Sequence, residues 1–459
     1  MVKSGGARRS FAEGSVVGHI VRMSVPMMLA QLVNILYNVV DRIYISNIPG
    51  TGSFALAGVG VAMPVISLVT AFTGLLGQGG VPLCSMARGR GDNEEAQRCL
   101  GHAFVLLLGA AAILMAVVWG FMVPLLRLFG ATAETGIYAE SYLRVYMIGA
   151  PFAMLGLGLN GYINAQGFPR RGMMTVLLGA LSNILLDPLF IFALDMGVAG
   201  AAWATVLSQL LSAVCCLSFL FGKKAELRLR PGGFVLRGSM VKAMLGLGIT
   251  NFVMQFTNVL VQTACNRQLI AWGSELHLSA FVIINSLRLI FVEIVMGFCH
   301  GMQPVLGFNY GAGEKERVLR CIRYSAAISV TLGVLLCAAI WFFPCQIIGI
   351  FTSDPALMTV AQHSVQIYFC GFFFMSLQGI GQNTFLSLGQ AKKAVFFALL
   401  RKAFLVVPLT LLLPGLGFGV DGVFWSEPIS DTVSGCVAFA TMLLTVYFPI
   451  RRQYKEELQ

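Results

Sequence analysis

The sequence predicts an all-α integral membrane protein with twelve transmembrane helices, arranged as two six-helix lobes. The first observation is the composition: 57% of the 459 residues are hydrophobic and only 11% are charged, with a mean hydropathy of +0.81. A soluble domain carries about 25% charged residues. The second observation is that apolar runs long enough for the ~20-residue span of a bilayer recur along the whole chain. The third is an internal repeat that relates the two halves.

Twelve apolar runs account for the predicted helices, and polar stretches separate them. The first twenty residues are polar and basic, and no small-residue cleavage site follows the first run. We therefore interpret that run as a retained helix and not as a signal peptide. The predicted spans cover about residues 21–46, 54–78, 99–125, 137–162, 173–193, 197–221, 243–270, 277–301, 322–344, 360–385, 395–413 and 418–448.

The positive charges lie mainly on one side of this predicted topology. Most of the 31 Lys and Arg residues fall in the N-terminal stretch, in every second loop and in the C-terminal tail. Arg401 and Lys402 are counted with Lys392 and Lys393 in the tenth loop. Because cytoplasmic loops carry the excess of Lys and Arg, both termini are predicted in the cytoplasm. The net charge of +11 therefore orients the helices and does not indicate a nucleic-acid partner.

The second half of the chain repeats the first at a distance of 222 residues. Trp119 has its counterpart in Trp341, and GVAGAAW at 197–203 corresponds to GVDGVFW at 419–425. Near the start of each half the distance becomes 224. Because each copy has an even number of helices, both lobes should have the same orientation and be related by a pseudo-two-fold axis along the membrane normal. Parallel repeats of this kind are typical of transporters.

These boundaries divide the chain into five parts. We expect a cytoplasmic tail, an N-lobe of helices one to six, a cytoplasmic connector, a C-lobe of helices seven to twelve, and a second cytoplasmic tail. In that order the parts are 1–20, 21–222, 223–242, 243–448 and 449–459.

Polar residues form one face of the first predicted helix. From Gln31 to Asp41 the polar residues follow one another at spacings of 3, 4 and 3, which places them on one stripe of the helix. The seventh helix repeats the stripe, except that the thiol of Cys265 replaces the carboxylate of Asp41. The stripes consist of Gln31, Asn34, Asn38 and Asp41 in the first helix, and of Gln255, Asn258, Gln262 and Cys265 in the seventh.

The segment SNILLDPLFIF at 182–192 places an acid inside an apolar run. Asn183 and Asp187 are one turn apart on the fifth helix, and their counterparts in the second half are both leucine. A charged side chain at mid-bilayer costs roughly 2.5–3.5 kcal/mol on insertion scales, so its presence indicates a function. Pro188 has no N–H, which leaves a carbonyl without its helical partner and predicts a kink beside the acid.

Asp41, the fifth-helix pair and Thr205 on the sixth helix make an oxygen-rich set that the second half lacks. Carboxylate, amide and hydroxyl oxygens suit a hard cation, and two nearby carboxylates can also share a proton. We therefore predict an ion or proton site that consists of Asp41, Asn183, Asp187 and Thr205. The structural alternative is that the two acids are buried partners of Arg42, Arg144 or a polar network.

The second half has acids of its own. Glu293 lies midway along the eighth helix, where it can either attract a cationic substrate or pair with Arg288. Glu427 and Asp431 lie one turn apart near the start of the twelfth helix, and we interpret them as a structural pair. Aromatic residues such as Tyr37 can add a cation–π contact to a cationic substrate.

Four segments are specific in combination: PMMLAQLVNILYNVVDRIYI at 26–45, SNILLDPLFIF at 182–192, GVAGAAWATVLSQ at 197–209 and QPVLGFNYGAG at 303–313. They resemble the multidrug and toxic compound extrusion (MATE) family, and the last is similar to its bacterial branch of broad drug exporters. The resemblance implies twelve helices in two lobes, in the inner or plasma membrane of a bacterium. It also implies exchange of an organic cation for H⁺ or Na⁺ by alternating access.

The resemblance further implies roles for single residues. Asp41 matches the family's first-helix acid, and Asn183 and Asp187 match its fifth-helix pair. Thr205 matches a sixth-helix hydroxyl of members with a cation site in the N-lobe. Some branches place important acids on the seventh and tenth helices, but those helices contain no mid-span carboxylate in this chain. Candidates for the substrate cavity are Gln31, Asn34, Tyr37, Asn38, Gln255, Asn258 and Glu293.

We therefore expect a secondary active antiporter that exports organic cations or other amphipathic toxic compounds. It should be a monomer in the lipid bilayer, without a cofactor other than the coupling ion, H⁺ or Na⁺. No metal other than Na⁺ at the coupling residues is expected. The eleven cysteines contain no CxxC pair and suit packing better than metal binding.

The alternatives are a flippase for a lipid-linked saccharide and an exporter of one specific metabolite. A flippase would need several cations in its lumen, whereas Arg144 and Arg288 are the main mid-span candidates. A membrane-embedded prenyl transferase would need an Asp-rich motif to hold diphosphate through Mg²⁺, and no DDxxD occurs. We therefore expect that the protein is not an enzyme.

Labelling of single introduced cysteines with a membrane-impermeant reagent checks the topology. In a background without reactive native cysteines, loops at about 48–52 and 271–276 should be labelled in intact cells, because the positive-inside rule places them outside. Loops at about 223–240 and 314–318 should react only after the cells are opened. The reverse pattern would contradict the predicted orientation.

Overall fold

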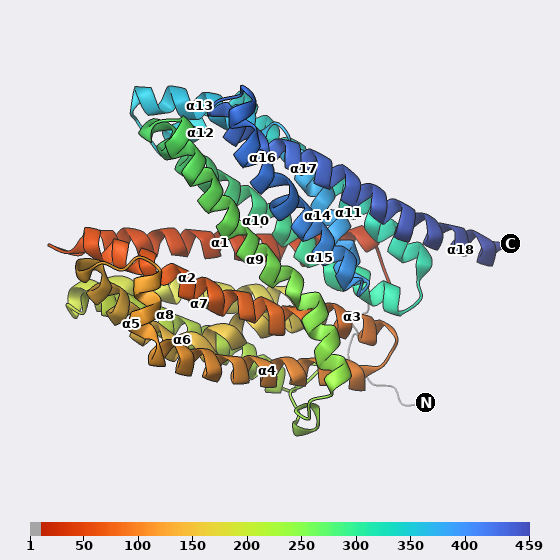
Figure 1. Cartoon of the computed structure of the whole chain (residues 1–459). Coiled ribbons are helices and arrows are strands. Elements are labelled where there is room, and N and C mark those ends of the chain that lie inside the picture. The colour runs from red at the N-terminus through yellow and green to blue at the C-terminus, as the bar shows by residue number, and fades with distance from the viewer. Residues whose placement is uncertain (1–10) are drawn as a thin grey trace. The chain divides into compact units, whose positions relative to one another are not determined.

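The computed structural model describes residues 11–459, and every regular element in that range is helical (Figure 1). The chain forms two compact units. The first contains residues 29–248 together with the described residues 11–15, and the second contains Val16–Met28 and Ile249–Gln459. Two helices, α1 (Val16–Ser46) and α9 (Gly238–Trp272), contribute to both units.

The other elements follow in chain order. Those of the first unit are α2 (Gly52–Leu76), η1 (Gln78–Gly80), α3 (Val81–Gly89), α4 (Asn93–Gly120), α5 (Met122–Leu128), α6 (Ala133–Ala165), α7 (Pro169–Pro188), η2 (Leu189–Ala193), α8 (Gly197–Phe221) and η3 (Pro231–Gly233). Those of the second are α10 (Glu275–Gly311), α11 (Lys315–Phe342), α12 (Pro344–Gly349), α13 (Pro355–Phe369), α14 (Phe372–Ser387), α15 (Ala391–Leu399), η4 (Leu400–Val406), α16 (Val407–Leu412), η5 (Pro414–Leu416), α17 (Asp421–Met442), η6 (Leu443–Tyr447) and α18 (Phe448–Leu458).

Eleven helices in the described range are long and apolar enough to cross a membrane. They correspond to eleven of the twelve predicted spans. The remaining span, predicted at about 360–385, is divided between α13 and α14, which are separated at Cys370 and Gly371. A Cβ at Gly371 would lie 2.7 Å from the carbonyl oxygen of Pro428, so the division occurs where α17 packs very closely.

Helix boundaries recur at the distance that the sequence repeat predicts. α4 begins at Asn93 and ends at Gly120, and α11 begins at Lys315 and ends at Phe342, which is 222 residues later at both ends. α6 covers the same stretch as α13 and α14 together. The turns agree as well, since Gly167 and its counterpart Gly389 have φ values of 81° and 74°. A left-handed φ favours glycine, which explains why both copies have it at this turn.

Small residues bring the helices of the first unit close together. α6 packs against α2, α4, α7 and α8. A Cβ at Gly149 of α6 would lie 2.8 Å from the side chain of Val206, and one at Gly156 would lie 3.4 Å from Ser212 Oγ, both on α8. Glycines two turns apart therefore let α6 and α8 approach closely, as is common in membrane helices. This packing fixes the position of α8 beside the candidate site.

The second unit uses the same principle. α14 packs against α11 and α17, and α10 packs against α11, α13 and α14. A Cβ at Gly435 of α17 would lie 2.3 Å from the carbonyl oxygen of Phe374 on α14. The N-terminal part of α1 joins this unit because Ser24 Oγ donates a hydrogen bond to the carbonyl oxygen of Phe298, at 3.0 Å.

The connector after α8 packs on the first unit. Gln166 Oε1 accepts a hydrogen bond from the backbone N–H of Leu227 at 2.9 Å, and His102 Nε2 accepts one from that of Arg237 at 2.8 Å. Arg88 forms an ion pair with Glu226. These contacts hold the connector against α3, α4 and the C-terminal end of α6.

Three helices contain π-helical segments: η2, η4 and η6. Directly after Pro188, where the sequence predicts a kink, the helix changes to the π-helical segment η2, in which the N–H of Leu194 donates to the carbonyl oxygen of Leu189 at 2.9 Å. In the second unit, η4 interrupts the helix that runs from Ala391 to Leu412. π-helical turns are rare and frequently lie at functional sites.

The close contact between α9 and α2 yields a stability prediction. A Cβ at Gly248 would lie 1.9 Å from the carbonyl oxygen of Leu75, whereas one at Gly60 would meet no atom within 4 Å. Gly248→Ala should therefore lower the free energy of unfolding by about 1–3 kcal/mol, as overpacking does. Gly60→Ala, the matched control in α2, should be neutral or stabilising because alanine favours a helix by about 1 kcal/mol. Thermal unfolding of the purified protein in detergent measures both, and equal midpoints would contradict the packing.

Candidate functional site

The structure brings the four predicted coupling residues together in the first unit. Asn183 Nδ2 donates to Asp187 Oδ1 at 3.2 Å and to Thr205 Oγ1 at 3.4 Å. Asp187 is 0% exposed, and Asp41 is close enough to interact directly with it. The residues come from α1, α7 and α8.

Local structure explains each position. Asn183 and Asp187 are one turn apart on α7, so both side chains lie on the same face. Thr205 lies on α8, which packs against α7. Its hydroxyl donates to the carbonyl of Ala201 at 3.0 Å, so its lone pair is directed at the Asn183 amide. The helix that carries Asp187 becomes π-helical one residue after Pro188.

Three oxygen atoms of this site are buried without a hydrogen-bond partner. They are Asp41 Oδ1, Asn183 Oδ1 and Asp187 Oδ2. All three are acceptors, and most buried polar atoms in proteins have a partner. Leaving a buried acceptor unsatisfied costs about 1–3 kcal/mol. A proton or a hard cation supplies what these atoms lack, so the donor set fits H⁺ and Na⁺ equally.

Tyrosines complete the surroundings of the site. Tyr37, which the sequence indicates as a cavity residue, interacts with Asp41 and Asp187. Tyr142 lies close to Thr205, and the ring of Tyr146 stacks on that of Tyr142 with centroids 6.0 Å apart. Sequence reasoning missed the two α6 tyrosines. Their spacing of four residues on one helical face was the available signal.

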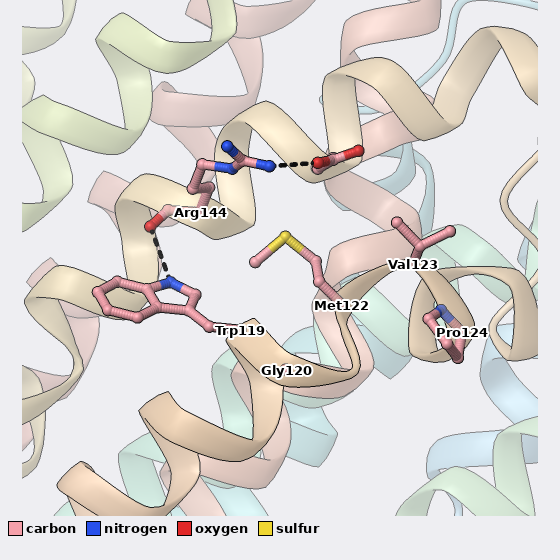
Figure 2. A pocket seen from close by; sticks show the side chains of 7 residues that line it. Trp119, Gly120, Met122, Val123, Pro124 and Arg144 are labelled. Atoms are coloured by element: carbon pink, nitrogen blue, oxygen red, sulfur yellow. Dashed lines mark hydrogen bonds and ion pairs between the residues drawn. The ribbon is translucent and has the colours of Figure 1, made fainter.

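The alternative that Arg144 is the buried ion-pair partner of Asp41 or Asp187 is not supported. Its guanidinium pairs with Glu140 on the same helix, with Nη2 and Oε1 2.6 Å apart. Both residues line a pocket of about 490 Å³ at the junction of α4 and α5, where Trp119 Nε1 donates to the carbonyl oxygen of Arg144 at 3.4 Å (Figure 2). The pocket is also lined by Gly120, Met122, Val123 and Pro124.

The candidate substrate residues are distributed over both units. Gln31, Asn34, Tyr37 and Asn38 lie on the part of α1 that belongs to the first unit. Asn38 is exposed and its side chain donates to the carbonyl of Asn34 at 2.6 Å. In the second unit Gln255 and Asn258 are exposed on α9, and Glu293 is half-buried on α10.

The second unit contains a buried cluster of five charged residues, two of which sequence reasoning placed incorrectly. The assignment of Arg401 and Lys402 to the basic tenth loop is wrong: both lie in η4 and are only 5% and 6% exposed. Arg288 contacts Glu427 at 2.8 Å and Asp431 at 3.3 Å. The loop assignment failed because it treated η4 as part of a basic surface run. Glu427 and Asp431 are paired, but with cations from two other elements.

The comparisons with known proteins agree over most of the chain. The MatE family model matches residues 26–189 and 251–412. The multidrug export protein MepA of Staphylococcus saprophyticus is 25% identical over 438 residues, which are 95% of this chain and 94% of that protein. MepA of Staphylococcus aureus is 24% identical with the same coverage.

Solved structures show the same fold. A structure described as MATE in the bent conformation has a TM-score of 0.89, with 25% identity and 98% coverage of both chains. A MOP superfamily transporter from Pyrococcus furiosus has a TM-score of 0.90, with 23% identity, covering 98% of this chain and 100% of that one. An outward-facing MATE family transporter of the MOP superfamily has a TM-score of 0.88, with 24% identity over 95% of this chain and 97% of that one.

Proposed function

Since the chain belongs to the MatE family of multi-pass bacterial membrane transporters, we propose that it is a multidrug exporter driven by entry of H⁺ or Na⁺. Its relatives are named multidrug export proteins, which supports a substrate range of many compounds. We place it in the inner or plasma membrane with both termini in the cytoplasm, as the distribution of Lys and Arg favours. It is proposed to work as a monomer without a cofactor.

One observation carries the proposed coupling: the three unpartnered oxygens of the first unit belong to Asp41, Asn183 and Asp187. Intramembrane acids are costly and mark ion or proton pathways. Binding of a cation neutralises the two carboxylates and satisfies their free acceptors. Because Asp187 lies beside η2, the charge state of this carboxylate can influence the conformation of α7.

Exchange requires that ion and substrate favour opposite states of the transporter. A ligand shifts a conformational equilibrium only by its differential affinity for the two states. A cation at Asp41 and Asp187 removes negative charge from the first unit, and this unit also presents the polar face of α1. An organic cation would bind more weakly there once the carboxylates are neutralised. Electrostatic competition therefore provides a route to antiport.

A flippase remains the main alternative, and one observation bears on it. The second unit buries three cations, Arg288, Arg401 and Lys402, which is more than the sequence suggested. Each of them contacts a carboxylate, however, so their charge is largely compensated inside the unit. Efflux of a fluorescent organic cation from everted vesicles distinguishes the two, because a flippase should not transport it. Separate pH and sodium gradients identify the coupling ion.

Asp187→Asn tests the coupling site. The change retains the shape of the side chain and removes its charge, so ion-driven dye efflux should be abolished while the protein is still inserted and folded. Leu409→Asn, at the repeat-related position, is the control and should reduce stability without a specific loss of ion dependence. Efflux assays at matched expression measure both, and normal transport by Asp187→Asn would refute the proposal.

Glu293→Gln tests electrostatic contact with the substrate. If Glu293 meets the substrate, a dicationic dye should lose at least a few-fold in apparent affinity, because a partly desolvated contact exceeds the ~0–1 kcal/mol of a surface pair. A monocationic dye should be affected less, and the response to the ion gradient should persist. Equal loss for both dyes together with loss of ion dependence would instead place Glu293 in coupling.

A further inference from the structure

We propose that the charged cluster of the second unit is a second proton-binding site, in which Lys402 gives up and regains one proton. The cluster consists of Arg288 on α10, Arg401 and Lys402 on η4, and Glu427 and Asp431 on α17. This inference goes beyond the coupling site of the first unit and does not rest on it.

Ion pairs link all five side chains. Lys402 Nζ lies 2.8 Å from Glu427 Oε1, and Arg288 Nη2 lies 2.8 Å from Glu427 Oε2. Asp431 receives Arg288 and Arg401, each at 3.3 Å. Each of the five side chains is at most 7% exposed. The cluster is therefore a single electrostatic unit that is shielded from water.

The formal charges of the cluster do not balance. Three cations face two carboxylates, which leaves an excess of one positive charge when all five groups are ionised. A buried charge without a counterpart is strongly unfavourable in a membrane protein. Loss of one proton from one of the cations makes the cluster neutral.

Lys402 is the cation that can lose this proton. Arginine does not deprotonate in proteins, whereas a buried lysine does so readily. Glu427 attracts the positive charge of Lys402, and Arg401 and Arg288 repel it. Within residues 11–459, the one carboxylate that Lys402 contacts is that of Glu427, while Arg288 contacts both acids. Deprotonation breaks one N–H bond, leaves the electron pair on Nζ and releases H⁺ to water.

The elements around Lys402 supply a defined set of titratable groups. The helices that pack directly on η4 are α15, α16 and α17. Beyond the five charged residues, the cluster interacts with Cys265 of α9, and the guanidinium of Arg288 lies 5.3 Å from the ring centroid of Tyr368 on α13. Lys393 of α15 is turned away, since its Nζ donates to Thr445 Oγ1 at 2.9 Å.

The repeat places this cluster where the first unit has its oxygen site. Glu427 is the counterpart of Thr205 at 222 residues, and Cys265 is the counterpart of Asp41 at 224. Lys402 lies one turn before Leu405, which corresponds to Asn183. The π-helical turn of η4 narrows the angle between consecutive side chains, so Arg401 and Lys402 both reach α17, where their partners are one turn apart. Equivalent places in the two copies thus hold two different kinds of ionisable site.

Solid-state ¹⁵N NMR of the protein in lipid vesicles, labelled at lysine Nζ, tests the proposal without substrate or transport. The chain has nine lysines, so the side-chain signals are few. Lys402→Arg should remove one signal and identify it, and Lys393→Arg, the matched control, should remove a different one. If Lys402→Arg does not fold, Lys402→Met serves the same assignment.

The expected result is that the Lys402 signal alone changes from ammonium to neutral amine as the pH rises from mildly acidic to mildly alkaline. A signal that remains ammonium over this range overturns the proposal and indicates that a bound anion balances the cluster. A signal that remains neutral also overturns it, because no proton is then exchanged. Failure of dye efflux in any variant leaves this measurement unaffected, so the two proposals fail separately.

Discussion

The cost of a charged or unpaired polar group away from water is the constraint on which the rest of this structure depends. In a bilayer, backbone groups are satisfied inside helices, which explains why the described chain is entirely helical in its regular elements. Side chains have no such general solution. Each buried acid or base must find a partner within its own unit, and the few that do not become candidates for binding an ion.

The two units meet this constraint in different ways. The first uses oxygens: Asn183 bridges Asp187 and Thr205, and three acceptors still lack donors. The second uses ion pairs, in which Glu427 and Asp431 bind cations from α10 and η4. A set whose unsatisfied atoms are all acceptors attracts an external cation. A set that contains both positive and negative side chains largely compensates its own charge. Loss of one proton then removes the remaining excess of positive charge.

Helix packing makes both arrangements possible. Glycines on α6 allow α8 to approach, which holds Thr205 near α7, and Gly435 allows α17 to approach α14. Close packing also leaves little room for side chains to rearrange, since interiors are dense. The π-helical segments η2 and η4 are departures from regular helix next to both sites.

Sequence by itself determined the helical membrane class and eleven of the twelve spans, because hydropathy and the 3.6-residue period depend only on local composition and order. Comparison of the two halves singled out Asp41, Asn183, Asp187 and Thr205, since a difference between copies is visible without coordinates. Only the tertiary structure decided the partners. Arg401 and Lys402 are buried in ion pairs and do not lie in the predicted loop. Arg288 forms ion pairs with Glu427 and Asp431. Tyr142 lies beside the oxygen site. A residue's ion-pair partner on another helix depends on helix rotation and on a π-helical turn, and neither is encoded in the local pattern of one helix.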